Sequence, residues 1–159
     1  MNKLQMLRDP GHFLALGGGS GLMPKGPGTA GTVVGFLFYW PLAGLDTVSY
    51  LLVVAGLFAC GIPLCQRTAR AVGTHDHPAI VWDEIVGILL TMTFVSPSVV
   101  NCLCAFSLFR IFDIFKPWPI GLLDRGVKGG LGIMLDDAVA AVFAAISLVF
   151  IEYLSYIYN

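Results

Sequence analysis

The chain alternates between long apolar stretches and short polar breaks. None of the apolar stretches has the strict two-residue alternation of a β-barrel strand, and backbone groups in a bilayer must be satisfied within one helix, so we expect helices. Several stretches contain only about 16 residues, whereas a helix that spans the hydrocarbon core needs about 20. The pattern therefore predicts an all-α, polytopic membrane bundle of four or five apolar helices. The stretches are Thr32 to Leu45, Val48 to Cys65, Ile80 to Val95, Val99 to Phe115, and Met134 to Tyr158.

The composition favours a bilayer as the solvent. Apolar residues make up 57% and charged residues 12% of the 159 residues, against roughly 25% charged residues in soluble domains. Nine basic and ten acidic residues nearly cancel, which gives no electrostatic reason to expect nucleic-acid binding. The polar amino terminus lacks the apolar core of a secretory signal, so we expect no cleaved leader. The cysteines lack C-x-x-C spacing and are expected to be ordinary buried thiols: Cys60, Cys65, Cys102 and Cys104.

Basic residues gather in alternate connections between the apolar stretches. The connections around Asp46 and Ser96 contain no Lys or Arg. Lys and Arg concentrate on the cytoplasmic side of membrane proteins. We therefore expect the base-rich connections to lie together in the cytoplasm, where they would form one polar site. These bases are Lys3, Arg8, Lys25, Arg67, Arg70, Lys116, Arg125 and Lys128.

Two pairs of adjacent acids precede apolar runs, and we expect both pairs at helix starts. They are Asp83-Glu84, before the third apolar helix, and Asp136-Asp137, before the last. Carboxylates near a helix N-terminus interact favourably with its dipole, so simple helix capping is one interpretation. The repetition favours a second one, a shared divalent-cation site, because Mg²⁺ prefers carboxylate oxygens and relieves their repulsion. Asp83, Glu84, Asp136 and Asp137 are the predicted Mg²⁺ ligands.

A charged triplet ends the fourth apolar stretch. Arg110, Asp113 and Lys116 follow one another at three-residue intervals, and Pro117 then ends the helix. One interpretation is a local ladder of ion pairs. The other makes Asp113 a ligand or an acid/base group, with Arg110 and Lys116 as phosphate contacts. The spacing alone leaves both interpretations open.

Glycine-rich segments offer backbone amides that can approach a phosphate closely. The segment KGPGTAGT (Lys25 to Thr32) lacks the G-K-[ST] ending of a Walker motif. Lys25 and Thr29 are candidate substrate contacts in this segment, and Arg125 is another in the loop before the last apolar stretch. Lys128 follows in the same loop and is expected to be solvated.

Three further polar positions receive structural interpretations. His75, Asp76 and His77 resemble a metal trio, but alternate residues of an extended loop point to opposite sides, which favours a solvated turn over a zinc site. His12 receives no role. Glu152 is expected at the membrane interface, at the far end of the last helix.

In this order, the segments resemble the phosphatidylglycerophosphatase A family. The matching motifs are GSGLMPKGPGTAGT (Gly19 to Thr32), VWDEIVG (Val81 to Gly87), FRIFDIFKPWPI (Phe109 to Ile120) and LLDRGVKGGLGIMLDDAVAA (Leu122 to Ala141). The resemblance implies a Mg²⁺-dependent membrane enzyme that converts phosphatidylglycerophosphate and water to phosphatidylglycerol and phosphate. It also implies a bacterial inner membrane location with a cytoplasm-facing site. It makes no prediction about the oligomeric state.

Asp83, Asp113 and Asp137 are the candidate catalytic residues for this reaction. Attack by a metal-activated water is favoured over attack by an aspartate, because no nucleophile-base pair stands out, but both routes stay open. The main alternative is a cation or proton transporter that uses the same carboxylates. Such a path needs polar groups toward both sides of the membrane, and the Asp46 and Ser96 connections offer few. A non-catalytic assembly subunit is a third alternative, which leaves the clustered charges unexplained.

Overall fold

A computed structural model describes residues 3–74 and 77–158, and every regular element within them is helical. The elements are α1 (Lys3–Arg8), α2 (Pro10–Ala15), the 3-10 helix η1 (Gly17–Leu22), α3 (Pro27–Leu42), α4 (Thr47–Val72), α5 (Trp82–Thr91), α6 (Val99–Phe115), α7 (Ile120–Gly126) and α8 (Gly129–Tyr158). The all-α prediction is therefore confirmed for the described residues.

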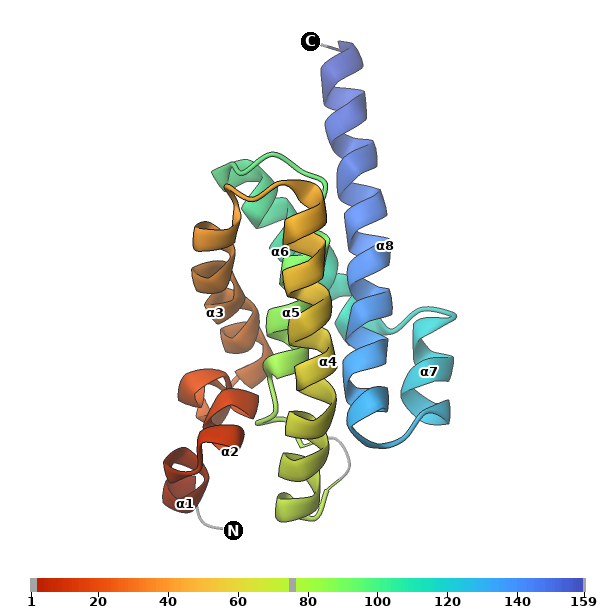
Figure 1. Ribbon diagram of the computed structural model, residues 1–159. Helices are drawn as coiled ribbons and strands as arrows, with labels where there is room; N and C mark the ends of the chain where they lie inside the picture. The colour runs from red at the N-terminus through yellow and green to blue at the C-terminus, as the bar shows by residue number, and fades with distance from the viewer. Residues whose placement is uncertain (1–2, 75–76, 159) are drawn as a thin grey trace.

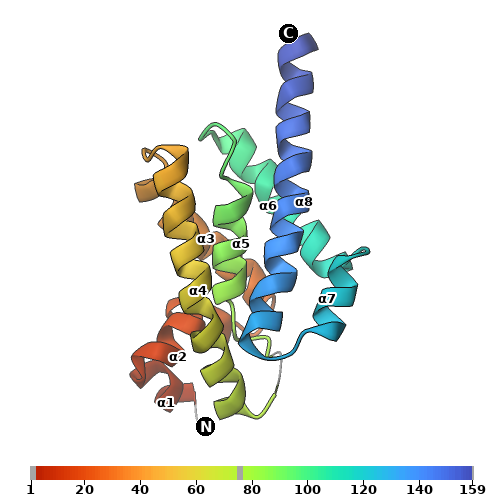
Figure 2. The same cartoon turned by 45° about the vertical axis from the view of Figure 1, so that its right-hand side comes forward.

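Helix α5 forms the centre of the bundle. It contacts α3, α4, α6 and α8, and Figures 1 and 2 show it enclosed by these longer helices. Ile85 and Leu89 are completely buried. A helix that is apolar on all sides is stable only inside such an enclosure. Its ten residues extend only about 15 Å, so α5 is a core helix that brings its amino-terminal acids into the bundle.

Helices α4 and α8 are long and apolar enough to cross a membrane. They contain 26 and 30 residues with mean hydropathies of 2.2 and 2.1 in their most apolar windows, and about 20 residues suffice for a span. Val48 and Leu52 of α4 are 68% and 69% exposed. Large apolar surface of this kind is unfavourable in water. Length and composition thus identify two candidate spans among the described residues.

Each of the five predicted apolar stretches is largely helical, and the fourth has the predicted bounds. Helix α6 begins after Ser98, whose Oγ accepts a hydrogen bond from the Asn101 amide at 3.1 Å. It ends at Phe115, and the next residue, Lys116, adopts a left-handed conformation with φ 41°. Pro117 then follows, and proline cannot continue a helix.

The expected start of the last helix was wrong. Helix α8 begins at Gly129 instead of Met134, so Asp136 and Asp137 lie in its third turn, beyond the range of the helix dipole. The glycines here permit close helix packing instead of forming a loop. A Cβ atom on Gly130 would collide with the backbone oxygen of Ile62 in α4.

The amino-terminal segment packs against α4, which the polar sequence did not predict. Asp9 forms an ion pair with Arg67 at 2.6 Å, and buried His12 contacts the Thr68 hydroxyl through Nδ1 at 2.9 Å. The Thr68 hydroxyl itself donates to the Leu64 carbonyl at 2.9 Å.

Several smaller predictions have clear outcomes. His75 and Asp76 lie outside the described residues, so the choice between a turn and a zinc site stays a prediction. The expectation of buried thiols is confirmed for Cys65 alone, since Cys102 and Cys104 are half-buried and Cys60 is exposed. Glu152 accepts a hydrogen bond from the Asn101 amide group at 3.1 Å, which joins α8 to the start of α6.

Candidate active site

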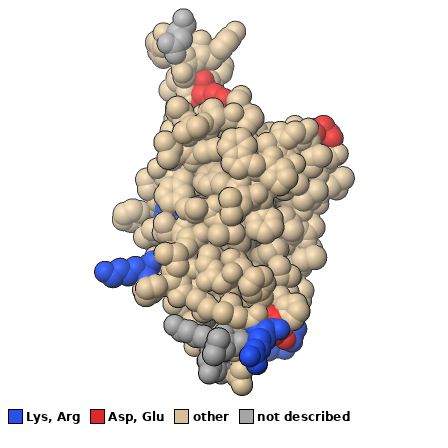
Figure 3. Space-filling view, turned by 90° about the vertical axis from the view of Figure 1, so that its left-hand side faces the viewer, with Lys and Arg blue, Asp and Glu red and all other residues tan. Residues whose placement is uncertain are grey.

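A polar cavity of about 350 Å³ opens at the end of the bundle where α5 and α8 begin and α6 ends. Its lining comes from the start of α3, α5, the end of α6, α7 and α8. Basic side chains also lie toward this end, and Figure 3 shows none at the upper end of the face in view. The charged residues of the lining are Asp83, Glu84, Arg110, Asp113, Lys116, Asp124, Asp136 and Asp137.

Three of these acids form a compact cluster. Asp83 and Glu84 occupy the first turn of α5, where the helix dipole favours negative charge, and Asp137 approaches from α8. One carboxylate oxygen of each lies within 4.8 Å of the others. Asp83 Oδ1, Glu84 Oε2 and Asp137 Oδ2 are buried without a hydrogen-bond partner among the described residues.

The chemistry of this cluster fits a hard divalent cation. Buried carboxylate oxygens without donors are costly, and a cation would satisfy all three. Mg²⁺ prefers hard oxygen ligands such as carboxylates. Asp83, Glu84 and Asp137 could therefore hold Mg²⁺.

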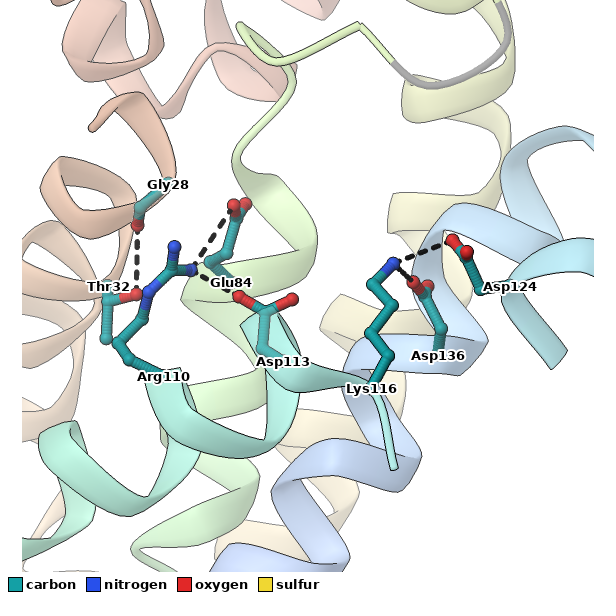
Figure 4. A network of polar contacts seen from close by, with 8 residues as sticks. All are labelled: Gly28, Thr32, Glu84, Arg110, Asp113, Lys116, Asp124 and Asp136. Atoms are coloured by element: carbon teal, nitrogen blue, oxygen red, sulfur yellow. Dashed lines mark hydrogen bonds and ion pairs between the residues drawn. The ribbon is translucent and has the colours of Figure 1, made fainter. Parts of the chain in front are cut away.

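Arg110 lies beside the cluster and joins α6 to α5. Its Nη1 donates to Asp113 Oδ2 at 2.5 Å and lies 3.7 Å from Glu84 Oε1. Figure 4 shows the guanidinium group between these two carboxylates. Its Nε is buried without a partner among the described residues. Arg110 thus balances two acids and still has an N–H group to donate.

Lys116 occupies the other side of the cavity. Its ammonium lies 2.5 Å from Asp136 Oδ2 and 2.7 Å from Asp124 Oδ1 (Figure 4). Partial burial disfavours the charged form, but the hydrogen bonds to Asp124 and Asp136 outweigh that effect and raise the pKa of Lys116 above its ordinary value. The predicted ladder of ion pairs is therefore only half present. Asp113 pairs with Arg110, whereas Lys116 pairs with Asp124 of α7 and Asp136 of α8.

Close backbone approach at α3 completes the cavity wall. A Cβ atom on Gly28 would collide with Glu84 Oε1 and crowd Arg110. The Gly28 carbonyl accepts a hydrogen bond from the Thr32 hydroxyl at 2.9 Å (Figure 4). The glycine-rich segment therefore brings the α3 backbone against the charged residues of α5 and α6.

The predicted site residues are only partly brought together. Asp136 lines the cavity, but it contacts Lys116 and is not part of the three-acid cluster, so its role as a metal ligand stays a prediction. Lys25, Thr29 and Arg125 are exposed and do not line the cavity. The guanidinium Nε of Arg125 donates to the Gly121 carbonyl at 2.8 Å. The substrate contacts predicted for these three residues likewise stay predictions.

Sequence reasoning assigned no role to Asp124. Its contact with Lys116 spans eight residues and depends on the turn between α6 and α7. Pro117 ends α6 between the two residues, so they belong to different helices and no periodicity within one element connects them. The only available signal was an acid within a matching motif.

A comparison with known protein families covers all the residues that line the cavity. The family model of phosphatidylglycerophosphatase A matches residues 13–152. The chain belongs to this family. The match includes the whole polar cavity, and it confirms the resemblance drawn from the four sequence motifs. It assigns the chain to a family of lipid phosphatases.

Individual relatives extend over nearly the same length. Phosphatidylglycerophosphatase A of Escherichia coli K12 is 44% identical over 146 residues, 91% of this chain and 85% of the relative. That of Haemophilus influenzae is 43% identical over 155 residues, 96% of this chain and 94% of the relative. A Bacteroides thetaiotaomicron relative, provisionally named a phosphatidylinositol-3-phosphatase, is 34% identical over 84% of this chain and 88% of its own. No solved structure matches the chain.

Proposed function

We propose that this protein hydrolyses phosphatidylglycerophosphate to phosphatidylglycerol and inorganic phosphate, and that it requires Mg²⁺. The observation that carries the proposal is the buried acid cluster of Asp83, Glu84 and Asp137 beside Arg110 in one open cavity. Acids alone would repel a phosphate, whereas a cation and neighbouring bases would attract it. Membership of the family and the two closely similar phosphatidylglycerophosphatases support the same substrate.

The acid cluster would hold the metal, and the bases would orient the phosphate. When bound, Mg²⁺ supplies positive charge that stabilises the phosphoryl oxygens. Arg110 has a guanidinium N–H that no described residue accepts. Lys116 has three N–H groups, of which two are directed to Asp124 and Asp136. Both side chains can therefore donate to a phosphate without losing their present partners.

Asp113 is suited to positioning and to proton transfer. Its Oδ2 accepts from Arg110, which fixes the carboxylate at the cavity wall. A proton must leave the attacking water and another must reach the departing glycerol oxygen, and a carboxylate at this wall can serve either step. Attack by water and attack by an aspartate are distinguished by quenching the reaction with acid. A phosphorylated protein is expected only for the aspartate route.

The proposed placement is a multi-pass protein of the bacterial inner membrane with the cavity facing the cytoplasm. The candidate spans α4 and α8 and the bases at the cavity end support this orientation, since such bases favour the cytoplasmic side. A lipid phosphate in the headgroup layer would then meet the cavity directly. Family membership gives no support to the transporter alternative.

The test is phosphate release by the purified protein in liposomes, with Mg²⁺ and after its removal by chelation. Phosphatidylglycerophosphate is compared with phosphatidic acid and with phosphatidylinositol 3-phosphate. We expect Mg²⁺-dependent release, fastest from phosphatidylglycerophosphate. Absence of release from all three lipids would refute the phosphatase proposal, and a preference for another lipid would refute the substrate.

A further inference from the structure

A second hollow lies farther along α3 and α6 from the polar cavity and has the opposite chemistry. It encloses about 390 Å³ between α3 and α6 and is lined almost entirely by apolar side chains. We call it the α3–α6 groove, and its lining residues are Val33, Phe36, Trp40, Val99, Cys102, Leu103 and Phe106. The sequence analysis predicted no binding role for any of these residues.

The groove and the cavity occupy consecutive turns of α6. Cys102, Phe106, Arg110 and Ile114 follow one another at four-residue intervals, and residues so spaced lie on one ridge of a helix. The first two line the groove and the last two line the cavity. The wall formed by α6 therefore passes from apolar to charged within one turn, between Phe106 and Arg110.

Helix α3 supplies the opposite wall, and along it too the cavity residues give way to groove residues with distance from the cavity. Gly28 lines the cavity, Val33 begins the groove five residues later, and Trp40 ends it. Trp40 is twelve residues from Gly28, which is about 18 Å along the helix axis. One leaflet of a bilayer has a hydrocarbon thickness of about 15 Å, half of the ~30 Å core. From the cavity, the groove thus extends about as deep as one leaflet.

A second apolar hollow, between α5 and α8, does not share this continuity. It encloses about 600 Å³, and Ile146 belongs to its lining. On α8, Ala141 lies between Asp137 and this hollow, and its carbonyl lies 3.5 Å from the Thr91 hydroxyl of α5. Both residues are completely buried, so the two helices are closed against each other there. A chain that leaves the cavity cannot follow this seam.

We propose that the α3–α6 groove binds an acyl chain of the lipid whose phosphate enters the polar cavity. The inference rests on the proposed phosphatase function for the identity of that lipid. An amphipathic substrate needs charged donors at one end and an apolar channel at the other, and the two helices provide both in that order. Binding energy from a remote apolar part of a substrate can position its reacting end.

Narrowing the groove from each wall tests the proposal kinetically. Val33→Trp on α3 and Leu103→Trp on α6 replace side chains that are 54% and 63% exposed, so the bundle core is untouched. For each variant, kcat/KM is measured with long-chain and with dihexanoyl phosphatidylglycerophosphate. We expect the ratio of long-chain to short-chain kcat/KM to fall by about tenfold, a typical effect of a small volume change in an apolar pocket.

Ile146→Trp is the matched control, because Ile146 is 66% exposed and lines the α5–α8 hollow. Its chain-length ratio should stay within about twofold of the wild-type ratio. An unchanged ratio in both groove variants, or an equal fall in the control, would overturn the proposal.

A binding measurement separates this inference from the proposed activity. The probe is a phosphonate analogue of phosphatidylglycerophosphate with a photoreactive group on its acyl chain. Labelling should concentrate on peptides of α3 and α6 and be displaced by unlabelled phosphatidylglycerophosphate but not by phosphatidylcholine. Displaceable labelling without phosphate release would support the groove and refute the activity. Phosphate release with labelling spread evenly over the exposed helices would refute the groove alone.

Discussion

The ammonium of Lys116 donates a hydrogen bond to Asp136 and thereby joins the end of α6 to the third turn of α8. The Asp136 side chain is only 7% exposed, whereas that of Lys116 is 26% exposed. The two residues are twenty positions apart. A nearly buried carboxylate thus depends on a charge that a different helix provides.

Replacing Lys116 with Met should lower both stability and phosphate release. Asp136 would keep its buried charge without the ammonium, which should lower the free energy of unfolding by about 2 kcal/mol. The midpoint of thermal unfolding in detergent measures this effect. Lys128→Met, at an exposed position, should leave that midpoint nearly unchanged. Equal losses in the two variants would contradict the role of the contact.

The stability contributed by Lys116 should persist across neutral and mildly alkaline pH. Its pKa is raised in the folded protein from an ordinary value of 10.5. A raised folded pKa means that the contribution is complete below the unfolded pKa and is lost as pH rises through the folded one. The difference in unfolding midpoint between wild type and Lys116→Met should therefore be constant from about pH 6 to pH 9. Loss of the difference within that window would contradict the pairing.

Asp83→Asn and Asp137→Asn should each reduce phosphate release by at least about a hundredfold, because each removes a charge from the proposed cation site. Asp46→Asn is the matched control at the opposite end of the bundle. Asp46 caps α4 by accepting from the amides of Val48 and Ser49, and asparagine caps equally well. Initial rates in liposomes provide the measurement. Full activity in either cluster variant would remove that residue from the site.

Mg²⁺ should stabilise the wild-type protein, since a ligand that binds only the folded state raises its unfolding free energy. The effect should be much smaller in Glu84→Gln, which lacks one of the three clustered carboxylates. The unfolding midpoint is recorded against Mg²⁺ concentration after treatment with a chelator. An identical Mg²⁺ response in the variant would argue against Glu84 as a ligand.

Gly28→Ala should impair activity although it adds only one methyl group, because the new Cβ atom would displace Glu84 or Arg110. A shift of about 1 Å in a reacting group can cost about a hundredfold in rate. Gly56→Ala is the matched control, since nothing lies within 4 Å of the added Cβ atom. Helix propensity predicts that this control is as stable as wild type or more so. Comparable activities in the two variants would contradict the close-packing argument.

Local sequence signals predicted some helix bounds well and others poorly. Helix α6 was predicted from end to end because its apolar stretch is bounded by the polar break around Ser96 and by Pro117, which stops a helix. The start of α8 was missed because three glycines before Met134 resemble a loop. Their actual role, close contact with α4 at Gly130, involves a partner that is distant in the sequence.

The candidate site likewise contains residues that local sequence revealed and contacts that only the fold revealed. Asp83 and Glu84 were recognised as a pair because adjacent acids before an apolar run stand out in any sequence. Their assembly with Asp137 required the α5–α8 packing, which no local spacing encodes. Lys116 was recognised as a site base, but its partner Asp124 was not, since that contact depends on how the chain turns after α6.

The length of α8 relates the depth of the cavity to the thickness of its host membrane. Figure 1 shows α8 extending past the other helices. Tyr156, which is 85% exposed, lies nineteen residues after Asp137 and close to the end of α8. That separation is about 28 Å, close to the ~30 Å hydrocarbon core. Tyrosine is enriched at membrane interfaces. If α8 crosses the membrane as proposed, anchoring at one interface would set the acid cluster at the level of the other. Bilayer thickness would then affect catalysis, because a poorly matched membrane would move the lipid phosphates away from the cavity mouth.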